Sequence, residues 1–276
     1  MEKELNHPLY FYAMQKFTEG SKRLIYHYTS AGNFFCILNS MSLKLSDFSN
    51  SDDLNEANIA NVDRISNVMT MNSLEKFIKS RCSYLSFVRG GDFEFGELEG
   101  TNHPRMWSQY ANKGFGVCLA IDEDRFFDIN KKSLSSNFYK FENVQYENKN
   151  GASVMIDVPY IEGNDESLIK RYYRELFFKK HLDWKGENEK RLFGIDLPKY
   201  LSIYEALEFI CLGPNFMKDD TSMTKLLDYI TNPSLKYKDY LVPQSFASIT
   251  PYDYGYFADD SFAVSEIERR LNMRKR

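Results

Sequence analysis

The chain has 276 residues, of which 43% are hydrophobic, 27% are charged and 16% are aromatic, and its formal net charge is −4. This length allows one large domain or two modest ones with a sizeable core. The negative charge argues against a general electrostatic grip on duplex nucleic acid, which needs clustered basic residues. Because no apolar run of about 18 residues and no signal peptide occurs, we expect no membrane contact and a cytoplasmic protein.

The opening of the chain predicts a strand, a helix and a second strand. After an arm or short helix that ends at Gly20, the apolar run at 24–28 predicts a strand. Ser30 is expected to cap a helix, because apolar residues follow it at a spacing of three to four, as in a buried helix face. The alternation of Leu43 and Leu45 with polar neighbours predicts a strand over 42–47.

The rest of the chain mixes helices and strands without regular alternation. We expect helices at 55–80, 104–111, 165–182, 204–208 and 219–230, and strands at 82–88, 115–122, 138–147 and 209–215. A further helix is expected at the C-terminal end. This mixture predicts an α+β fold. We treat residues 1–276 as a single domain with a core at 22–216 and a helical or irregular extension at 217–276.

The four cysteines are widely separated and lie in apolar surroundings, at Cys36, Cys82, Cys118 and Cys211. Their spacing matches no zinc site, so we expect buried, reduced thiols and no metal.

Three carboxylates in the segment after the second strand allow a different chemistry. Asp52, Asp53 and Glu56 could hold magnesium for phosphodiester hydrolysis. The alternative is that Asp53 caps a helix with Glu56 three residues later, in a capping-box arrangement, and this interpretation is favoured.

A series of short blocks between residues 24 and 216 is similar to a bacterial family, domain of unknown function 2971. The blocks are YHYTS, ILNS, LKLSDFSNSDDLNE, SYLSF, MWSQYANKGFGVCLAID, FENVQYEN, FKKHLDWKGENEKRL and EFICLGPNF. They follow the order typical of that family, in which the seventh block has the pattern KxxxWxxExExRL. The segment SNSDDLNE departs from the pattern, since Leu54 stands where a proline is usual and Ser51 where an aromatic residue is usual.

The first blocks also resemble the start of ADP-ribosyltransferase-like proteins, which include RNA 2′-phosphotransferases and DNA-modifying toxins. The shared features are a strand carrying His27, Tyr28 and Thr29, a helix ending in ILNS and a short strand. This resemblance implies a split β-sandwich of two small mixed sheets with surrounding helices. It also implies that NAD binds in a cleft as a substrate.

The resemblance implies roles for several side chains. His27 would fix a ribose hydroxyl while the glycosidic bond breaks, and Tyr28 and Thr29 would add contacts to the cofactor. Such proteins also need an acidic group late in the chain, and Glu189 is our candidate, with Arg191 as a fork for phosphate or carboxylate. These two residues lie two apart, so they share one face of a strand. A structural histidine and a surface ion-pair ladder are the alternatives.

Two further rings could bind the cofactor. Trp107 and Tyr110 lie three apart on a short predicted helix and could present their rings to nicotinamide or adenine. A core anchor is the favoured alternative for this pair. His181 and Trp184 are likewise expected to pack together on a helix.

Three functions remain open at this point. The first is an NAD-dependent ADP-ribosyltransferase or NAD glycohydrolase with a nucleic-acid or protein acceptor, acting as a toxin or phage-defence effector. The second is a non-catalytic recognition module with a partner protein in a defence or regulatory complex. The third is the metal-dependent nuclease built on the three carboxylates.

Overall fold

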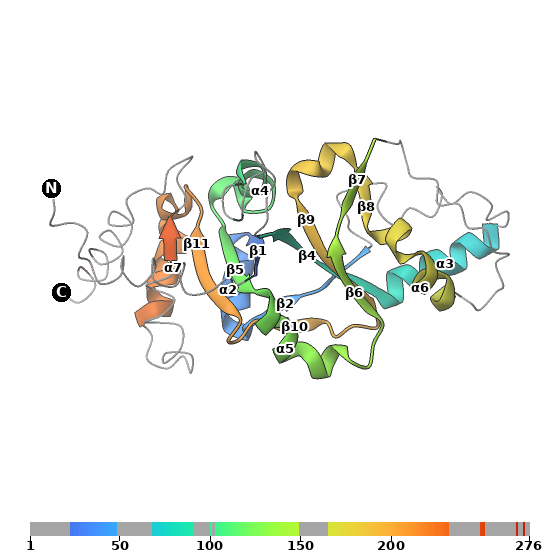
Figure 1. The fold of residues 1–276 in the computed structure, drawn as a ribbon. Helices are drawn as coiled ribbons and strands as arrows, with labels where there is room; N and C mark the ends of the chain where they lie inside the picture. The colour runs from blue at the N-terminus through green and yellow to red at the C-terminus, as the bar shows by residue number, and fades with distance from the viewer. Residues whose placement is uncertain are drawn as a thin grey trace. The chain divides into compact units, whose positions relative to one another are not determined.

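A computed structural model describes residues 23–48, 68–90, 100, 103–148, 165–231, 249–251, 269 and 273 (Figure 1). Within these ranges the chain mixes α-helices with largely antiparallel sheets, which confirms the α+β class. The chain packs as two compact units, each assembled from non-contiguous segments, so no single cut separates them. The first unit takes residues 1–41, 90–126 and 203–276, and the second takes 42–89 and 127–202.

The first unit is built on a sheet whose strand order is β12-β11-β5-β1. The strands are β1 (Leu24–Thr29), β5 (Val117–Asp122), β11 (Leu207–Leu212) and β12 (Ile249–Pro251). β5 pairs antiparallel with both β1 and β11, while β12 runs parallel to β11. All the β5 residues from Val117 to Ile121 are buried, as a central strand requires.

The helical segments of the first unit include α2 (Ala31–Ser40), α4 (Pro104–Gln109), η3 (Asn112–Gly114), η5 (Phe216–Lys218) and α7 (Asp220–Thr231). The predicted capping of α2 is confirmed, because the Ser30 side chain accepts a hydrogen bond from the backbone N–H of Asn33. The predicted apolar face of α2 is also buried: Phe34, Phe35, Ile37 and Leu38.

Gly116, at the start of β5, lets two backbones approach closely. A Cβ at this position would lie 2.1 Å from the carbonyl oxygen of Thr29 and 3.0 Å from the Cα of Ala111. Only glycine fits such a contact without displacing β1. The end of β1 is therefore held directly against the turn that precedes β5.

The second unit contains an antiparallel sheet in the order β4-β9-β6, with β3 paired to β4. The bounds are β3 (Ser46–Asp47), β4 (Cys82–Arg89), β6 (Tyr139–Asn143) and β9 (Glu189–Ile195). Two smaller pairs are β2 (Ser42–Lys44) with β10 (Tyr200–Ser202), antiparallel, and β7 (Gln145–Glu147) with β8 (Lys179–His181), parallel.

Helices α3 (Val68–Arg81) and α6 (Asp165–Phe177) cover one face of this sheet, and the short helix η4 (Leu182–Glu187) follows β8. Their contact forms an apolar core in which Phe177 stacks on Phe193 of β9, with ring centroids 4.1 Å apart. Other members of this core are Leu74, Ile78, Leu168, Ile169 and Ile195. The helix α5 (Glu123–Leu134) links the two units in sequence.

Four predicted elements differ from the structure. The strand expected at 42–47 is two strands with different partners, β2 and β3, and the strand expected at 138–147 is likewise divided into β6 and β7. The second break falls at Val144, whose N–H donates to the Glu189 carbonyl and whose side chain is buried. The helix expected at 204–208 is a turn into β11, with Glu205 in the left-handed region at φ 65°.

The helix expected at 165–182 ends at Phe177, and the chain then becomes extended as β8 to pair with β7. Helix α5 was not predicted from the sequence. Its signals were Glu123 and Asp124 in the first turn and Lys131 and Lys132 in the last, which suit the helix dipole.

Candidate functional site

The strand β9 places Glu189 and Arg191 on one face of the second unit's sheet, as their spacing predicts. They are not part of a surface ladder, because their side chains are only 3% and 1% exposed. The guanidinium Nε of Arg191 lies 2.7 Å from Glu189 Oε1, and Nη2 lies 2.9 Å from Oε2. This two-point contact is the strongest geometry for an arginine–carboxylate pair.

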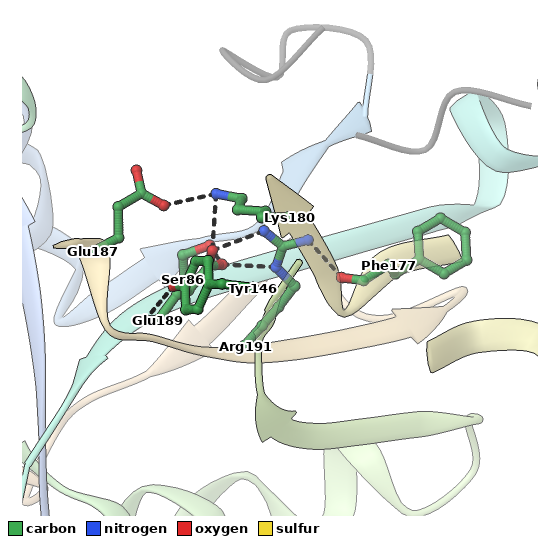
Figure 2. Close-up of polar contacts among 7 residues, drawn as sticks. All are labelled: Ser86, Tyr146, Phe177, Lys180, Glu187, Glu189 and Arg191. Atoms are coloured by element: carbon green, nitrogen blue, oxygen red, sulfur yellow. Dashed lines mark hydrogen bonds and ion pairs between the residues drawn. The ribbon is translucent and has the colours of Figure 1, made fainter. Parts of the chain in front are cut away.

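Further contacts use up the acceptor capacity of the Glu189 carboxylate. Oε1 also accepts a hydrogen bond from the Ser86 hydroxyl of β4, and Oε2 lies 2.9 Å from Lys180 Nζ of β8 (Figure 2). A carboxylate has about four lone-pair positions, and these four donors fill them. The remaining guanidinium nitrogen, Arg191 Nη1, donates to the Phe177 carbonyl at 2.7 Å.

A second carboxylate joins the same network. Lys180 Nζ lies 2.8 Å from Glu187 Oε2, and both side chains are almost fully buried. The Tyr146 hydroxyl accepts from the backbone N–H of Glu189 at 2.9 Å. We call the set Lys180, Glu187, Glu189, Arg191, Ser86 and Tyr146 the buried charge network (Figure 2). It holds two cationic and two carboxylate side chains.

The electrostatics keep Glu189 ionised. Burial by itself raises the pKa of Glu189, but the charges of Arg191 and Lys180, with hydrogen bonds from Arg191 and Ser86, hold the pKa well below its ordinary value. Burial also raises the pKa of Tyr146, so its phenol stays protonated at neutral pH. Glu189 can therefore act on a cation through its charge, but it cannot donate a proton.

The early candidate residues lie on β1 in the first unit. His27 is half-buried, and it shares one face of the strand with Ile25 and Thr29, which are both buried. In the antiparallel register it lies opposite Leu119 of β5. The imidazole thus sits at a partly accessible position of an otherwise buried strand face.

The rings proposed for cofactor binding pack inside the first unit. Trp107 of α4 is 1% exposed, and its ring meets that of Tyr28 edge-on with centroids 4.9 Å apart. The Tyr28 hydroxyl donates to the carbonyl of Gly100 at 2.6 Å. Tyr110 follows the end of α4 and is half-buried. The structure therefore brings Tyr28 and Trp107 together as core side chains.

His27 and the Glu189–Arg191 pair belong to different compact units. Their convergence in one site stays a prediction. The carboxylates Asp52, Asp53 and Glu56 lie outside the described residues, and so does the segment before residue 23. Among the described residues, no group of three or more His, Cys, Asp or Glu side chains is arranged to hold a metal ion.

The cysteines show one departure from expectation. Cys82, Cys118 and Cys211 are buried free thiols as predicted, but Cys36 is exposed. Burial raises the pKa of the Cys82 thiol to about 12 and that of Cys118 well above its ordinary value. These two thiols are therefore not nucleophiles at neutral pH.

Lys180, Ser86 and Tyr146 were not predicted as site residues. Lys180 was within reach of the sequence, because it is the lysine of the KxxxWxxExExRL block that also contains Glu187, Glu189 and Arg191. The structure shows what this spacing achieves: the lysine, both acids and the arginine meet in one network. Trp184 of the block lies beside Lys180, with Nζ 5.6 Å from the ring centroid.

His181 and Trp184 were expected on a helix continuous with α6. Instead His181 ends β8 and caps the short helix η4, where its Nδ1 accepts from the backbone N–H of Asp183. The extended conformation at 179–181 is what carries Lys180 into the network.

Comparison with known families supports the first resemblance. Residues 106–192 match the family described as protein of unknown function (DUF2971). The match includes Trp107 and the whole KxxxWxxExExRL block but not His27. The resemblance to the domain of unknown function 2971 family is thus confirmed over this segment. No curated protein matches the chain. None of the described helices is long and apolar enough to cross a membrane.

Proposed function

We propose that this protein is an ADP-ribosyltransferase-like enzyme with a split β-sandwich fold that binds NAD and breaks its nicotinamide–ribose bond. The order of the first elements supports the proposal, since β1, α2 and β2 follow each other as the resemblance to these enzymes implies. In this reaction the C1′–N bond breaks, its electron pair leaves with nicotinamide, and a nucleophile attacks C1′ of the ADP-ribose.

The observation that carries the proposal is the position of His27. It is a half-buried histidine on a strand face whose other members, Ile25 and Thr29, are buried. An imidazole nitrogen held there can bond a ribose hydroxyl, and the Thr29 hydroxyl lies two residues further along the same face. Fixing the ribose in this way lowers the entropic part of the barrier to cleavage.

In this proposal Glu189 and Arg191 serve the reaction through charge. A carboxylate that stays ionised favours the oxocarbenium-like cation that forms as nicotinamide leaves. The lone pairs of the Glu189 carboxylate already accept hydrogen bonds from protein groups. Glu189 therefore acts without a direct bond to the molecule that receives the ADP-ribose. The acceptor would be a nucleic acid, a protein or water, and the setting a cytoplasmic toxin or phage-defence effector.

The test is the release of nicotinamide from NAD by the purified full-length chain, followed by chromatography, together with NAD binding by calorimetry. We expect release by the wild type and its loss in His27→Ala. His181→Ala is the matched control, because it removes a partly exposed imidazole from a different strand. The proposal fails if wild type and His27→Ala neither bind NAD nor release nicotinamide.

A second candidate is a non-catalytic recognition module acting with a partner protein. The observation that favours it is the saturation of Glu189, whose four acceptor positions are all occupied within the protein. A network of this kind can serve the fold alone. The same assay discriminates the two candidates, since a module leaves NAD intact while its circular dichroism shows a folded protein.

A further inference from the structure

Lys180 contacts both carboxylates of the buried charge network. Its Nζ lies 2.8 Å from Glu187 Oε2 and 2.9 Å from Glu189 Oε2, and its side chain is 8% exposed. The close-up shows the ammonium group between the two acids (Figure 2). Arg191, by contrast, binds both carboxylate oxygens of Glu189, and its Nη1 donates to the Phe177 carbonyl.

Two buried carboxylates that share a counter-ion depend on it for their charge. Like charges held close together in a poorly solvated site cannot both stay ionised unless a cation compensates them. With Lys180 present the network contains two positive and two negative side chains. Without it, Arg191 alone would face two acids, and one acid would retain a proton.

The neutral groups that contact the network cannot replace the charge of Lys180. The Ser86 hydroxyl of β4 donates to Glu189, and the Tyr146 phenol of β7 binds the Glu189 backbone. From α6 the network receives the carbonyl oxygen of Phe177. Trp184 of η4 covers the ammonium side, with its ring centroid 5.6 Å from Lys180 Nζ.

We propose that Lys180 is a positioning residue that compensates the charges of Glu187 and Glu189, holds their carboxylates side by side and so fixes the acidic group of the reaction. The role in the reaction rests on the proposed NAD cleavage. The electrostatic role does not, so the two can be tested separately.

The test measures, from pH 4 to 8, the urea midpoint of unfolding and the rate of nicotinamide release for the full-length chain. Trp184 fluorescence reports the second unit in a Trp107→Phe background. In the wild type the pKa of Glu189 is depressed, so stability is fully present above the ordinary carboxyl pKa and falls as pH drops below it.

In Lys180→Met we expect the opposite slope. One carboxyl then has a pKa above its unfolded value, so stability falls as pH rises towards that raised pKa. Nicotinamide release should fall in the same variant, because Glu189 then loses one of the four donors that hold its carboxylate. Lys180→Arg keeps the charge and should retain the wild-type slope.

Lys179→Met is the matched control, because the neighbouring Lys179 pairs with Glu147 at 2.8 Å in a more exposed setting. This variant should leave the pH dependence of stability and the rate of nicotinamide release unchanged. If Lys180→Met does not fold, the double variant Glu187→Gln/Lys180→Met decides. In the double variant one cation, Arg191, again faces one carboxylate, Glu189. Recovered folding would support the proposal, and a double variant as unstable as Lys180→Met would overturn it.

The proposal is also overturned if Lys180→Met keeps the wild-type pH slope. A reversed slope in Lys180→Met, combined with no nicotinamide release by the wild type, would uphold the electrostatic role and refute the NAD reaction alone.

Discussion

Removing the guanidinium of Arg191 tests whether the buried charge network holds the second unit together. Arg191→Met keeps an unbranched apolar stem of similar length but deletes every polar contact of the side chain. Glu189 loses two of its four donors, and the Phe177 carbonyl loses the donor at 2.7 Å. A guanidinium contact with the Tyr84 ring, at 5.0 Å from the centroid, is lost as well.

The expected cost follows from the burial. Breaking a buried ion pair by removing one partner typically costs about 3–5 kcal/mol, because the other charge is left in a poorly solvated site. Here Lys180 still compensates part of the Glu189 charge, so we expect about 3 kcal/mol, the lower end of that range. Small domains are stable by only about 5–15 kcal/mol, so this loss is easily measured.

The assay is urea unfolding followed through Trp184 fluorescence in a Trp107→Phe background. The chain has two tryptophans, one in each unit, so this background reports the second unit alone. Arg174→Met is the matched control, because Arg174 also binds a glutamate, Glu142, through two nitrogens, but the Arg174 side chain is 61% exposed. Little change is expected there, since solvent screens exposed pairs.

Two results would refute this reasoning. One is a shift for Arg191→Met no larger than that for Arg174→Met. The other is strict additivity with Glu189→Gln, because a coupled buried pair requires the double variant to lose less than the sum of the single losses.

Further predictions concern the first unit and the loss of stability at acidic pH. Gly116→Ala should destabilise the protein by about 1–3 kcal/mol, since the new Cβ would lie 2.1 Å from the Thr29 carbonyl oxygen. Gly32→Ala in α2 places its Cβ where nothing lies within 4 Å, so it should stabilise the protein by about 0.5–1 kcal/mol. Thermal melts of the two variants check both predictions. Ser30→Ala should cost about 1 kcal/mol by the loss of the helix cap, measured by the same melts, and an unchanged melting temperature would contradict the capping. Wild-type stability should fall as pH drops below the ordinary carboxyl range, and Glu189→Gln should flatten that slope in urea titrations at pH 3–7; an equally steep slope in the variant would show that other carboxyls set it.

The sequence predicted the elements whose signals are local. Helix α2 has its cap and its apolar spacing within a dozen residues, and β4 and β5 are short segments rich in apolar and aromatic residues. The strand breaks were not predictable, because they depend on which distant strand each half meets. The segment 42–47 changes partner from β10 to β4 at Leu45, and nothing in its own alternation indicates that change.

The candidate site was predicted in one respect and missed in another. The two-residue spacing placed Glu189 and Arg191 on one strand face, but it left a solvated ion-pair ladder as the alternative, because charged residues are rarely buried. Burial follows from the core formed by α3 and α6 over β9, which brings Phe177 and Phe193 together. Lys180 was missed because a helix expected through residue 182 would not have placed it in the extended strand β8.

The most direct test of the proposed function is a time course of NAD with the purified chain, followed by proton NMR in one tube. The nicotinamide signals of NAD should broaden on binding and then be replaced by those of free nicotinamide. With His27→Ala the signals of intact NAD should persist, while His181→Ala should behave as the wild type. Sharp and unchanged NAD signals beside the folded wild-type protein would contradict the proposal.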